Sequence, residues 1–452
     1  MGLDELAKLS EGFAGEVVRP ADPAYDAARA VWNSMIDRRP GLIVRPTSAD
    51  DVVAALRFAR AQELVVAVRC GGHSIPGFST CDGGIVIDLS LMRGVEVDPE
   101  RCTARVRGGS LLAELDDAAQ AHRLVCPVGV VSHTGVAGLT LGGGMGRLQR
   151  KLGLTIDSLL AVDLVTADGQ VVRASEDENP ELFWGMRGAG ANFGIVTSFE
   201  FRLHPFEGLV THGTVTHPIE RAEQLAERYR ELVEEGPDEL WTSFGLAVGG
   251  DARGPVASVS VLHSGSPAEA ERHLAGLRAL GDQLEDSIEP KAYLASQRLF
   301  DAPMEWGQRF AMKSSFLASL PEPLVREWAD QISRVPKGAE GGFSVWAWGR
   351  AIASVPEQDT AFTGRDAAFW AGAEIVWNDS GLDDACRDWA RAGIATAAPH
   401  ASLGRYVNDV TEVGSDVARM IYGDAKYGRL VALKREWDPE NVFRLNQNIR
   451  PD

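Results

Sequence analysis

A histidine beside two glycines is the first feature of the sequence that could do chemistry. The apolar run ELVVAVR ends at Arg69 and continues directly into Cys70, Gly71, Gly72, His73 and Ser74. Glycines after a strand let backbone N–H groups converge into an anion-binding nest, which suits a diphosphate. An imidazole beside such a nest is a nucleophile that an activated cofactor could alkylate. Taken alone, these residues fit a turn with an exposed histidine better.

A second glycine-rich stretch extends from Gly129 to Gly146. Its GxGxxG-like spacings are weak evidence by themselves. The stretch follows no clean strand and lacks the acidic residue of a nicotinamide-binding unit. Such glycine density indicates close approach of the backbone to a flat or phosphorylated ligand, although a flexible loop has the same composition. A third segment, Gly188 to Val196, surrounds an asparagine and leads into a strand, and a tight turn explains it equally well.

Together and in this order, the segments resemble a known family. The chain is similar to FAD-linked oxidases with the flavin fold of the vanillyl-alcohol-oxidase and p-cresol-methylhydroxylase (PCMH) type, and within them to the berberine-bridge-enzyme-like branch. The likeness covers nearly the whole chain. It rests on RCGGHS, GGIVIDLSLM, VSHTGVAGLTLGGGMG, ENPELFWGMRGAGANFGIVTSFEF, YVN and KREWDPENVFRLNQNI.

The resemblance implies FAD attached covalently through its 8α-methyl to His73. It implies that backbone N–H groups of the histidine turn cradle the pyrophosphate, that glycines run beside the cofactor, that a strand meets the adenine end, and that asparagines close over the isoalloxazine. The residues implied for these four roles are, in turn, Arg69, Cys70, Gly71, Gly72 and Ser74; Gly135, Gly138, Gly142, Gly143 and Gly144; Ile195 and Val196; and Asn408, Asn446 and Asn448.

Many members of this family add a second tether through a cysteine ahead of the glycine-rich loop. That position is Val131 here, and Cys126 lies about one turn too early. The resemblance therefore implies one covalent bond. Leu139 stands where many members have a histidine, which weakens any expectation of polar contacts there.

Two residues are candidates for a catalytic base. Asp409 follows the YxN pattern where many alcohol-oxidising members carry a tyrosine. A partly buried carboxylate could act as a base, but a solvated loop residue is the slightly favoured interpretation. Tyr406 is the other candidate, with packing beside the flavin as its expected role. An amine substrate could need no base, because it can lose hydride from its neutral form.

Several tryptophans could form a wall for an aromatic substrate. Trp346 and Trp348 alternate as in a strand, which puts both on one face. Facing a cleft they would stack on a ligand, and facing a helix layer they would belong to the core; both interpretations stay open. Trp241, Trp306 and Trp370 could line the same space.

These residues need a scaffold, and the pattern predicts an α+β fold. The resemblance implies that residues 1–206 form a FAD-binding domain of PCMH type in two subdomains divided near residue 125. The strand and helix pattern predicts a small α/β unit from Leu42 to Leu124. Ser48 should begin a helix with Asp51 in a capping box. Ala167-Asp168-Gly169 should join two strands. Residues 207–400 should form an inserted α+β substrate domain with an antiparallel sheet, and residues 401–452 should return to the FAD-binding domain.

Composition excludes several classes of partner. The net charge of −19 makes nucleic acid and anionic membranes poor partners. Five cysteines without a CxxC pair indicate neither a disulfide scaffold nor a metal site. No apolar run approaches the length of a membrane span, and residues 1–20 do not resemble a secretory signal. We therefore expect a cytoplasmic monomer or homodimer whose partners are a small molecule and O2.

Three functions follow as hypotheses. The leading one is an oxidase that moves a hydride from an alcohol or amine carbon of an aromatic small molecule or natural product to flavin N5, with O2 reduced to H2O2. The second is a dehydrogenase that uses another electron acceptor. The third is a flavin-binding protein without redox activity.

Overall fold

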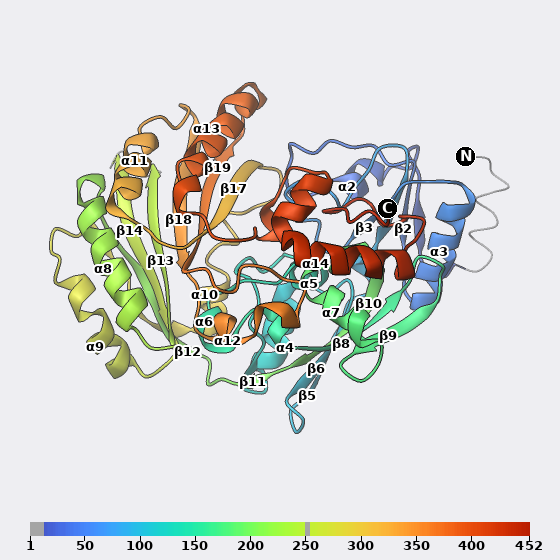
Figure 1. Ribbon diagram of the computed structural model, residues 1–452, viewed down its shortest axis with the longest axis horizontal. Helices are drawn as coiled ribbons and strands as arrows, with labels where there is room; N and C mark the ends of the chain where they lie inside the picture. The colour runs from blue at the N-terminus through green and yellow to red at the C-terminus, as the bar shows by residue number, and fades with distance from the viewer. Residues whose placement is uncertain (1–12, 249–253) are drawn as a thin grey trace.

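Three main β-sheets with associated helices organise the structure (Figure 1). The computed structural model describes residues 13–248 and 254–452. The interpretation of the N-terminus rests partly on residues 1–12, which lie outside the described residues. The first two sheets come from residues before 206 and the third from residues 209–377, so the chain has the predicted α+β composition.

The first sheet ends at the histidine turn. Ser48 caps helix α3 (Ala49–Ala61) by accepting the Asp51 N–H, as predicted. The Asp51 carboxylate forms no capping box with Ser48; it accepts the Thr47 N–H at 2.8 Å instead. Strands β2 and β3 run parallel to β4, so their carboxyl ends meet at one edge. The strands, in spatial order, are β1 (Glu16–Val18), β2 (Leu42–Arg45), β4 (Ile85–Asp88) and β3 (Val66–Arg69).

The second sheet is antiparallel and corrects the predicted subdomain division. The predicted hairpin is present, with Gly169 in the left-handed region (φ +83°) between β8 and β9. Strands β5 and β6 precede residue 125 yet belong to this sheet, because β6 pairs with β10. The prediction of one α/β unit from Leu42 to Leu124 is therefore wrong, because the chain leaves the first sheet after Asp88. The spatial order is β5 (Val95–Asp98), β6 (Thr103–Arg107), β10 (Ile195–Arg202), β8 (Leu159–Val165) and β9 (Val171–Ser175).

The third sheet belongs to the middle segment, which we define as residues 207–400. It is antiparallel, with two short strands at one edge and a nine-residue strand at the other. Figure 1 shows helices α8 (Ala222–Glu235), α9 (Pro267–Arg278), α11 (Glu322–Ile332) and α13 (Asp383–Ala395) on its outer side. The opposite face is turned toward the flanking part, which we define as residues 13–206 and 401–452. The strands are β12 (Leu209–Pro218), β13 (Leu240–Val248), β14 (Pro255–His263), β15 (Glu285–Asp286), β16 (Glu289–Ala292), β17 (Arg309–Leu317), β18 (Ala339–Ala347) and β19 (Phe369–Trp377).

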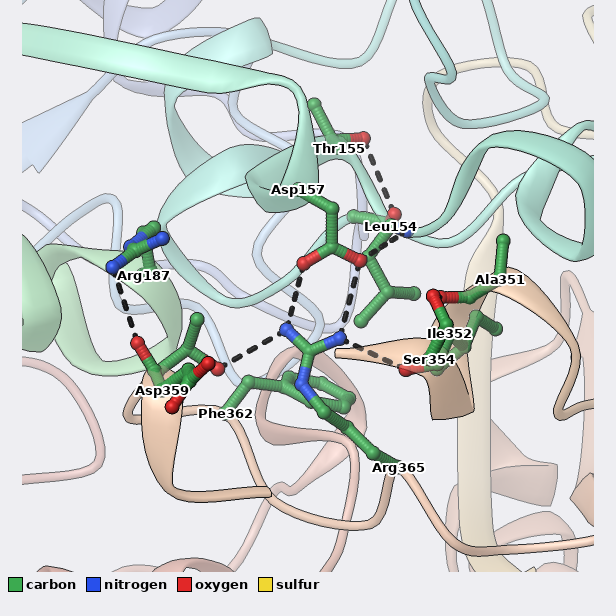
Figure 2. Close-up of polar contacts among 12 residues, drawn as sticks. Leu154, Thr155, Asp157, Arg187, Ala351, Ile352, Ser354, Asp359, Phe362 and Arg365 are labelled. Carbon is green, nitrogen blue, oxygen red and sulfur yellow. Dashed lines mark hydrogen bonds and ion pairs between the residues drawn. The ribbon is translucent and has the colours of Figure 1, made fainter. Parts of the chain in front are cut away.

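A buried ion pair joins the middle segment to the flanking part. Figure 2 shows the Arg365 guanidinium against the Asp157 carboxylate, with Nη2 to Oδ1 at 2.7 Å and both side chains buried. Asp157 also accepts the Leu154 N–H at 2.9 Å, which shapes the turn beside the glycine-rich stretch.

The C-terminal residues return to the flanking part. Helix α14 (Ser415–Trp437) lies across the flanking part in Figure 1. The tail then meets the third glycine segment, where the Asn192 Oδ1 accepts the Ile449 N–H at 3.0 Å. No helix in the described part of the chain is long and apolar enough to span a membrane.

Candidate functional site

One large cavity, of about 940 Å³, collects residues from both parts of the chain. Its walls include the histidine turn, the glycine-rich stretch, the third glycine segment and the inner face of the third sheet. No group of three or more His, Cys, Asp or Glu side chains within residues 13–248 and 254–452 is placed to hold a metal ion.

The histidine turn lines the cavity from Cys70 to Ser74. A Cβ on Gly71 would lie 2.2 Å from the Gly135 nitrogen, so the first two glycine segments pack backbone to backbone. Arg69 does not line the cavity. Its guanidinium binds Asp88 at 2.8 Å and the Ala30 carbonyl at 3.1 Å, where it anchors the end of β3.

His73 is held by aromatic and polar neighbours. Its Nε2 lies 2.6 Å from Nδ1 of His133, and its ring stacks on Trp32 with centroids 4.9 Å apart. Burial, with a smaller contribution from His133, lowers the pKa of His73 to about 3. The ring is therefore neutral at neutral pH, and Nδ1 has no hydrogen-bond partner in the described structure. His133 was not identified from the sequence, although it lies within the VSHTGVAG segment.

The glycine-rich stretch approaches the cavity with only some of its glycines. Gly135, Gly138 and Gly142 line it, whereas Gly143 and Gly144 do not. Gly143 faces Phe362 and Tyr406, and the Gly144 N–H donates to the Tyr406 hydroxyl at 3.1 Å.

The strand and tail positions are brought together at the cavity. Ile195 and Val196, at the start of β10, line it, as do Asn408 and Asn446. The Asn446 amide donates to the Ala191 carbonyl at 2.7 Å, and its Oδ1 is buried without a hydrogen-bond partner in the described residues. Asn448 is not part of the lining.

Tyr406 acts as an acceptor for backbone groups. Its buried hydroxyl oxygen accepts the N–H groups of Gly144 and Met145 at 3.1 and 3.2 Å, and the Asn408 amide at 3.2 Å. Burial raises the pKa of Tyr406 to about 12. The geometry suits a clamp on the glycine-rich stretch, and the phenol is a poor base at neutral pH.

Asp409 is buried, so the slightly favoured interpretation as a solvated loop residue is wrong. Only 6% of the residue is exposed, and its Oδ2 accepts the Trp370 indole N–H at 2.9 Å. Burial raises the pKa of Asp409 to about 7, with a further contribution from the Glu374 carboxylate. A carboxyl group with this pKa can both accept and release a proton near neutrality.

Glu374 is another carboxyl group in the cavity wall, and it was not predicted from the sequence. It lies on β19, lines the cavity and accepts the Ser344 hydroxyl at 2.8 Å. Burial raises its pKa. The signal was present in FWAGAEIVW, where one charged residue interrupts an apolar strand.

The tryptophans divide between cavity and core. Trp241, Trp346 and Trp370 line the cavity. Trp348 follows the end of β18 and is buried in the core, where its indole N–H donates to the Gly364 carbonyl at 3.0 Å. Trp306 is 47% exposed and meets the His73 ring edge-on. Only one of the two alternating tryptophans is therefore available to a ligand.

The position where many family members carry a second tether lies in the cavity wall but holds no thiol. Val131 lines the cavity and cannot form a thioether. Cys126 is buried away from the lining, and burial raises the pKa of its thiol. The fit to FAD comes from the glycine backbone, the neutral imidazole and the unpaired Asn446 oxygen, all at one cavity large enough for a dinucleotide.

Comparisons with known proteins agree with this geometry. The family described as FAD binding domain matches residues 40–175, and the family described as berberine and berberine like matches residues 405–450. The chain is 33% identical to (R)-6-hydroxynicotine oxidase of Paenarthrobacter nicotinovorans, over 97% of both chains. It is 29% identical to an FAD-linked oxidoreductase of Dictyostelium discoideum, over 98% of this chain and 96% of that protein.

Solved structures show the same fold. The crystal structure of 6-hydroxy-D-nicotine oxidase from Arthrobacter nicotinovorans superposes with a TM-score of 0.90 at 32% identity, covering 97% of this chain and 98% of that one. A chitooligosaccharide oxidase superposes with a TM-score of 0.86 at 22% identity over 99% of each chain, which concerns the fold alone. The chain therefore belongs to the berberine-bridge-enzyme-like FAD-linked oxidoreductases with the PCMH-type flavin fold.

Proposed function

We propose that the protein is an oxidase that carries FAD on His73 and oxidises an alcohol or amine carbon of an aromatic small molecule. The observation that carries the proposal is the neutral, half-buried imidazole of His73 in the wall of a cavity lined by glycines and by Trp241, Trp346 and Trp370. When bound, FAD would supply the redox chemistry by accepting a hydride at N5 and passing two electrons to O2, which yields H2O2.

The chain's own residues would position the substrate and handle its proton. The indoles of Trp241, Trp346 and Trp370 supply flat apolar surface for an aromatic ring. Asp409, with a pKa of about 7, would accept the hydroxyl proton of an alcohol. The same carboxylate, together with Glu374, would attract an amine, so both substrate classes suit this end of the cavity.

The experiment is an anaerobic screen for compounds that bleach the flavin of the purified holoenzyme. Aromatic alcohols and amines should reduce the flavin, and admitting air should restore its colour and release one H2O2 per substrate molecule oxidised. Bleaching with slow reoxidation by air and fast reoxidation by a quinone would identify a dehydrogenase. Absence of bleaching by every compound, although dithionite reduces the flavin, would favour a protein without redox activity.

A further inference from the structure

Arg147 is a buried cation in the cavity wall that the oxidation chemistry does not use. It is 2% exposed and lines the same cavity as the proposed flavin site. Its Nη1 donates to the Ser296 carbonyl at 3.1 Å and to the Gln297 amide oxygen at 3.3 Å, and its Nε is buried without a partner. No carboxylate among the described residues forms an ion pair with it.

The neighbours of Arg147 compensate its charge only in part. The guanidinium carbon lies 5.8 Å from the Trp241 ring centroid and 5.0 Å from that of Phe300, distances typical of cation–π contacts. The Asp116 carboxylate is hydrogen bonded to Gln297 at 3.3 Å, and it is not bonded to Arg147. Because an unpaired buried cation is strongly unfavourable, this site suits an anion supplied by a ligand.

A second observation points to a ligand at the same place. His212 and Trp241 are both paired with Leu262 of β14, so they share one face of the third sheet. Both line the cavity, are less than 5% exposed, and carry a buried ring nitrogen, His212 Nδ1 or Trp241 Nε1, without a hydrogen-bond partner in the described part of the chain.

The cavity wall connects this cation to the buried carboxyl group at Asp409. Trp241 meets Trp346 with ring centroids 4.9 Å apart, and Trp346 meets Trp370 at 5.9 Å. Trp370 in turn donates to Asp409. A row of three indoles on three adjacent strands thus has a cation at one end and a proton-accepting group at the other.

We infer that the substrate is an aromatic compound with an anionic oxygen group, such as a carboxylate, that binds Arg147 while the carbon to be oxidised lies toward Asp409. The inference rests on the proposed function, because it takes the tryptophan-lined cavity as the substrate site. It adds a charge requirement that neither alcohol nor amine oxidation demands.

The test measures binding of 2-naphthoate and 2-naphthamide to the holoenzyme through changes in the visible absorption of the flavin. These probes share their rings and differ in charge. The wild type should bind the carboxylate at least about tenfold more tightly, a difference of about 1.4 kcal/mol. Arg147→Met should remove the preference, and Arg147→Lys should keep part of it. Arg150→Met is the matched control, since Arg150 is equally buried but does not line the cavity.

Several outcomes would overturn the inference. One is equal binding of both probes by the wild type, which needs no variant to fold. Another is an unchanged preference in Arg147→Met with full flavin content. If Arg147→Met is unstable, Arg147→Lys takes its place. Binding of 2-naphthoate by Arg147→Lys no tighter than that of 2-naphthamide would count against the charge pairing. The readout requires no turnover, so failure of the oxidase proposal in the bleaching screen is recognised separately.

Discussion

At the scale of single residues, burial acts in opposite directions on His73 and Asp409. Burial disfavours the charged form of any group, so it lowers the pKa of the imidazole and raises that of the carboxyl group. The values, about 3 for His73 and about 7 for Asp409, leave a neutral nucleophile and a titratable acid in one cavity at neutral pH. This pairing supports separate roles in cofactor attachment and proton transfer.

Replacement of His73 by alanine should abolish the covalent flavin, because the neutral ring is the attachment site that we propose. Wild-type protein should keep its yellow colour in an acid precipitate, and peptide mapping should place the flavin mass on the His73 peptide. The His73→Ala variant should release its flavin into the supernatant. Cys126→Ser should behave like the wild type, and a flavin-bearing Cys126 peptide would refute the single attachment.

The pH dependence of flavin reduction should report Asp409. A carboxyl group accepts a proton only when ionised, so the rate with an aromatic alcohol should rise with pH through about 7 and level off above it. Asp409→Asn should lower the rate by about 10²–10⁴-fold and remove this rise. Glu340→Gln, which changes an exposed carboxylate of the same cavity, should retain it. Stopped-flow reduction without oxygen is the measurement, and an unchanged profile in Asp409→Asn would exclude the base.

At the scale of elements, the buried Arg365–Asp157 ion pair joins two parts of the chain that are far apart in sequence. The Arg365 side chain is 0% exposed and the Asp157 side chain is 8% exposed, and Arg365 also donates to the Ile352 carbonyl at 3.2 Å (Figure 2). The contact ties the middle segment to the turn that supports the glycine-rich stretch. Its role is therefore to hold the two halves of the cavity wall in place.

Removing one partner of this ion pair should lower the free energy of unfolding more than removing both partners. Arg365→Met leaves the Asp157 carboxylate buried and unpaired, and it should lower the free energy of unfolding by about 3–5 kcal/mol. Replacing Asp157 by leucine as well should restore part of that loss, because no uncompensated charge remains. Urea denaturation of the wild type, both single variants and the double variant measures the coupling. Strictly additive losses would argue against a buried pair.

At the scale of the whole molecule, the cavity is lined by both the flanking part and the middle segment. A ligand that fills it binds only when both walls are assembled. The two largest hydrophobic cores lie mainly on different sides of the cavity, one formed by the second sheet with α7 (Pro180–Ala189) and α14, the other by the third sheet with its outer helices. Two smaller clusters contain residues of both the flanking part and the middle segment. Filling the cavity should therefore stabilise the arrangement as a whole.

Added FAD should raise the melting temperature of the His73→Ala variant once its flavin has been removed. Ligand at one hundred times its dissociation constant stabilises a protein by about 2.7 kcal/mol. Riboflavin, which lacks the diphosphate and adenosine, should have a much smaller effect because it cannot use the glycine turn. Thermal unfolding over a range of FAD concentrations is the measurement, and equal stabilisation by riboflavin would refute a site for the diphosphate.

Features that depend on neighbouring residues could be predicted from the sequence. The Ser48 cap and the hairpin at Gly169 arise from local backbone chemistry, and both are present. The ordered glycine segments identified the flavin family for a related reason: tight turns and close backbone approach tolerate few residues other than glycine. The resemblance to this family then implied roles for His73 and Asn408, which stay predictions.

The set of side chains that share the cavity follows from tertiary packing and could not be predicted from local patterns. Asp409 is buried beside Trp370, and Glu374 and Arg147 lie in the cavity wall. Arg69 binds Asp88 outside the cavity, and Trp346 lines the cavity while Trp348 lies in the core. These outcomes depend on segments up to hundreds of residues away, whose identity no local pattern records. Burial and proximity set charge and pKa, so the chemistry of the site emerges only when the two halves of its wall are packed together.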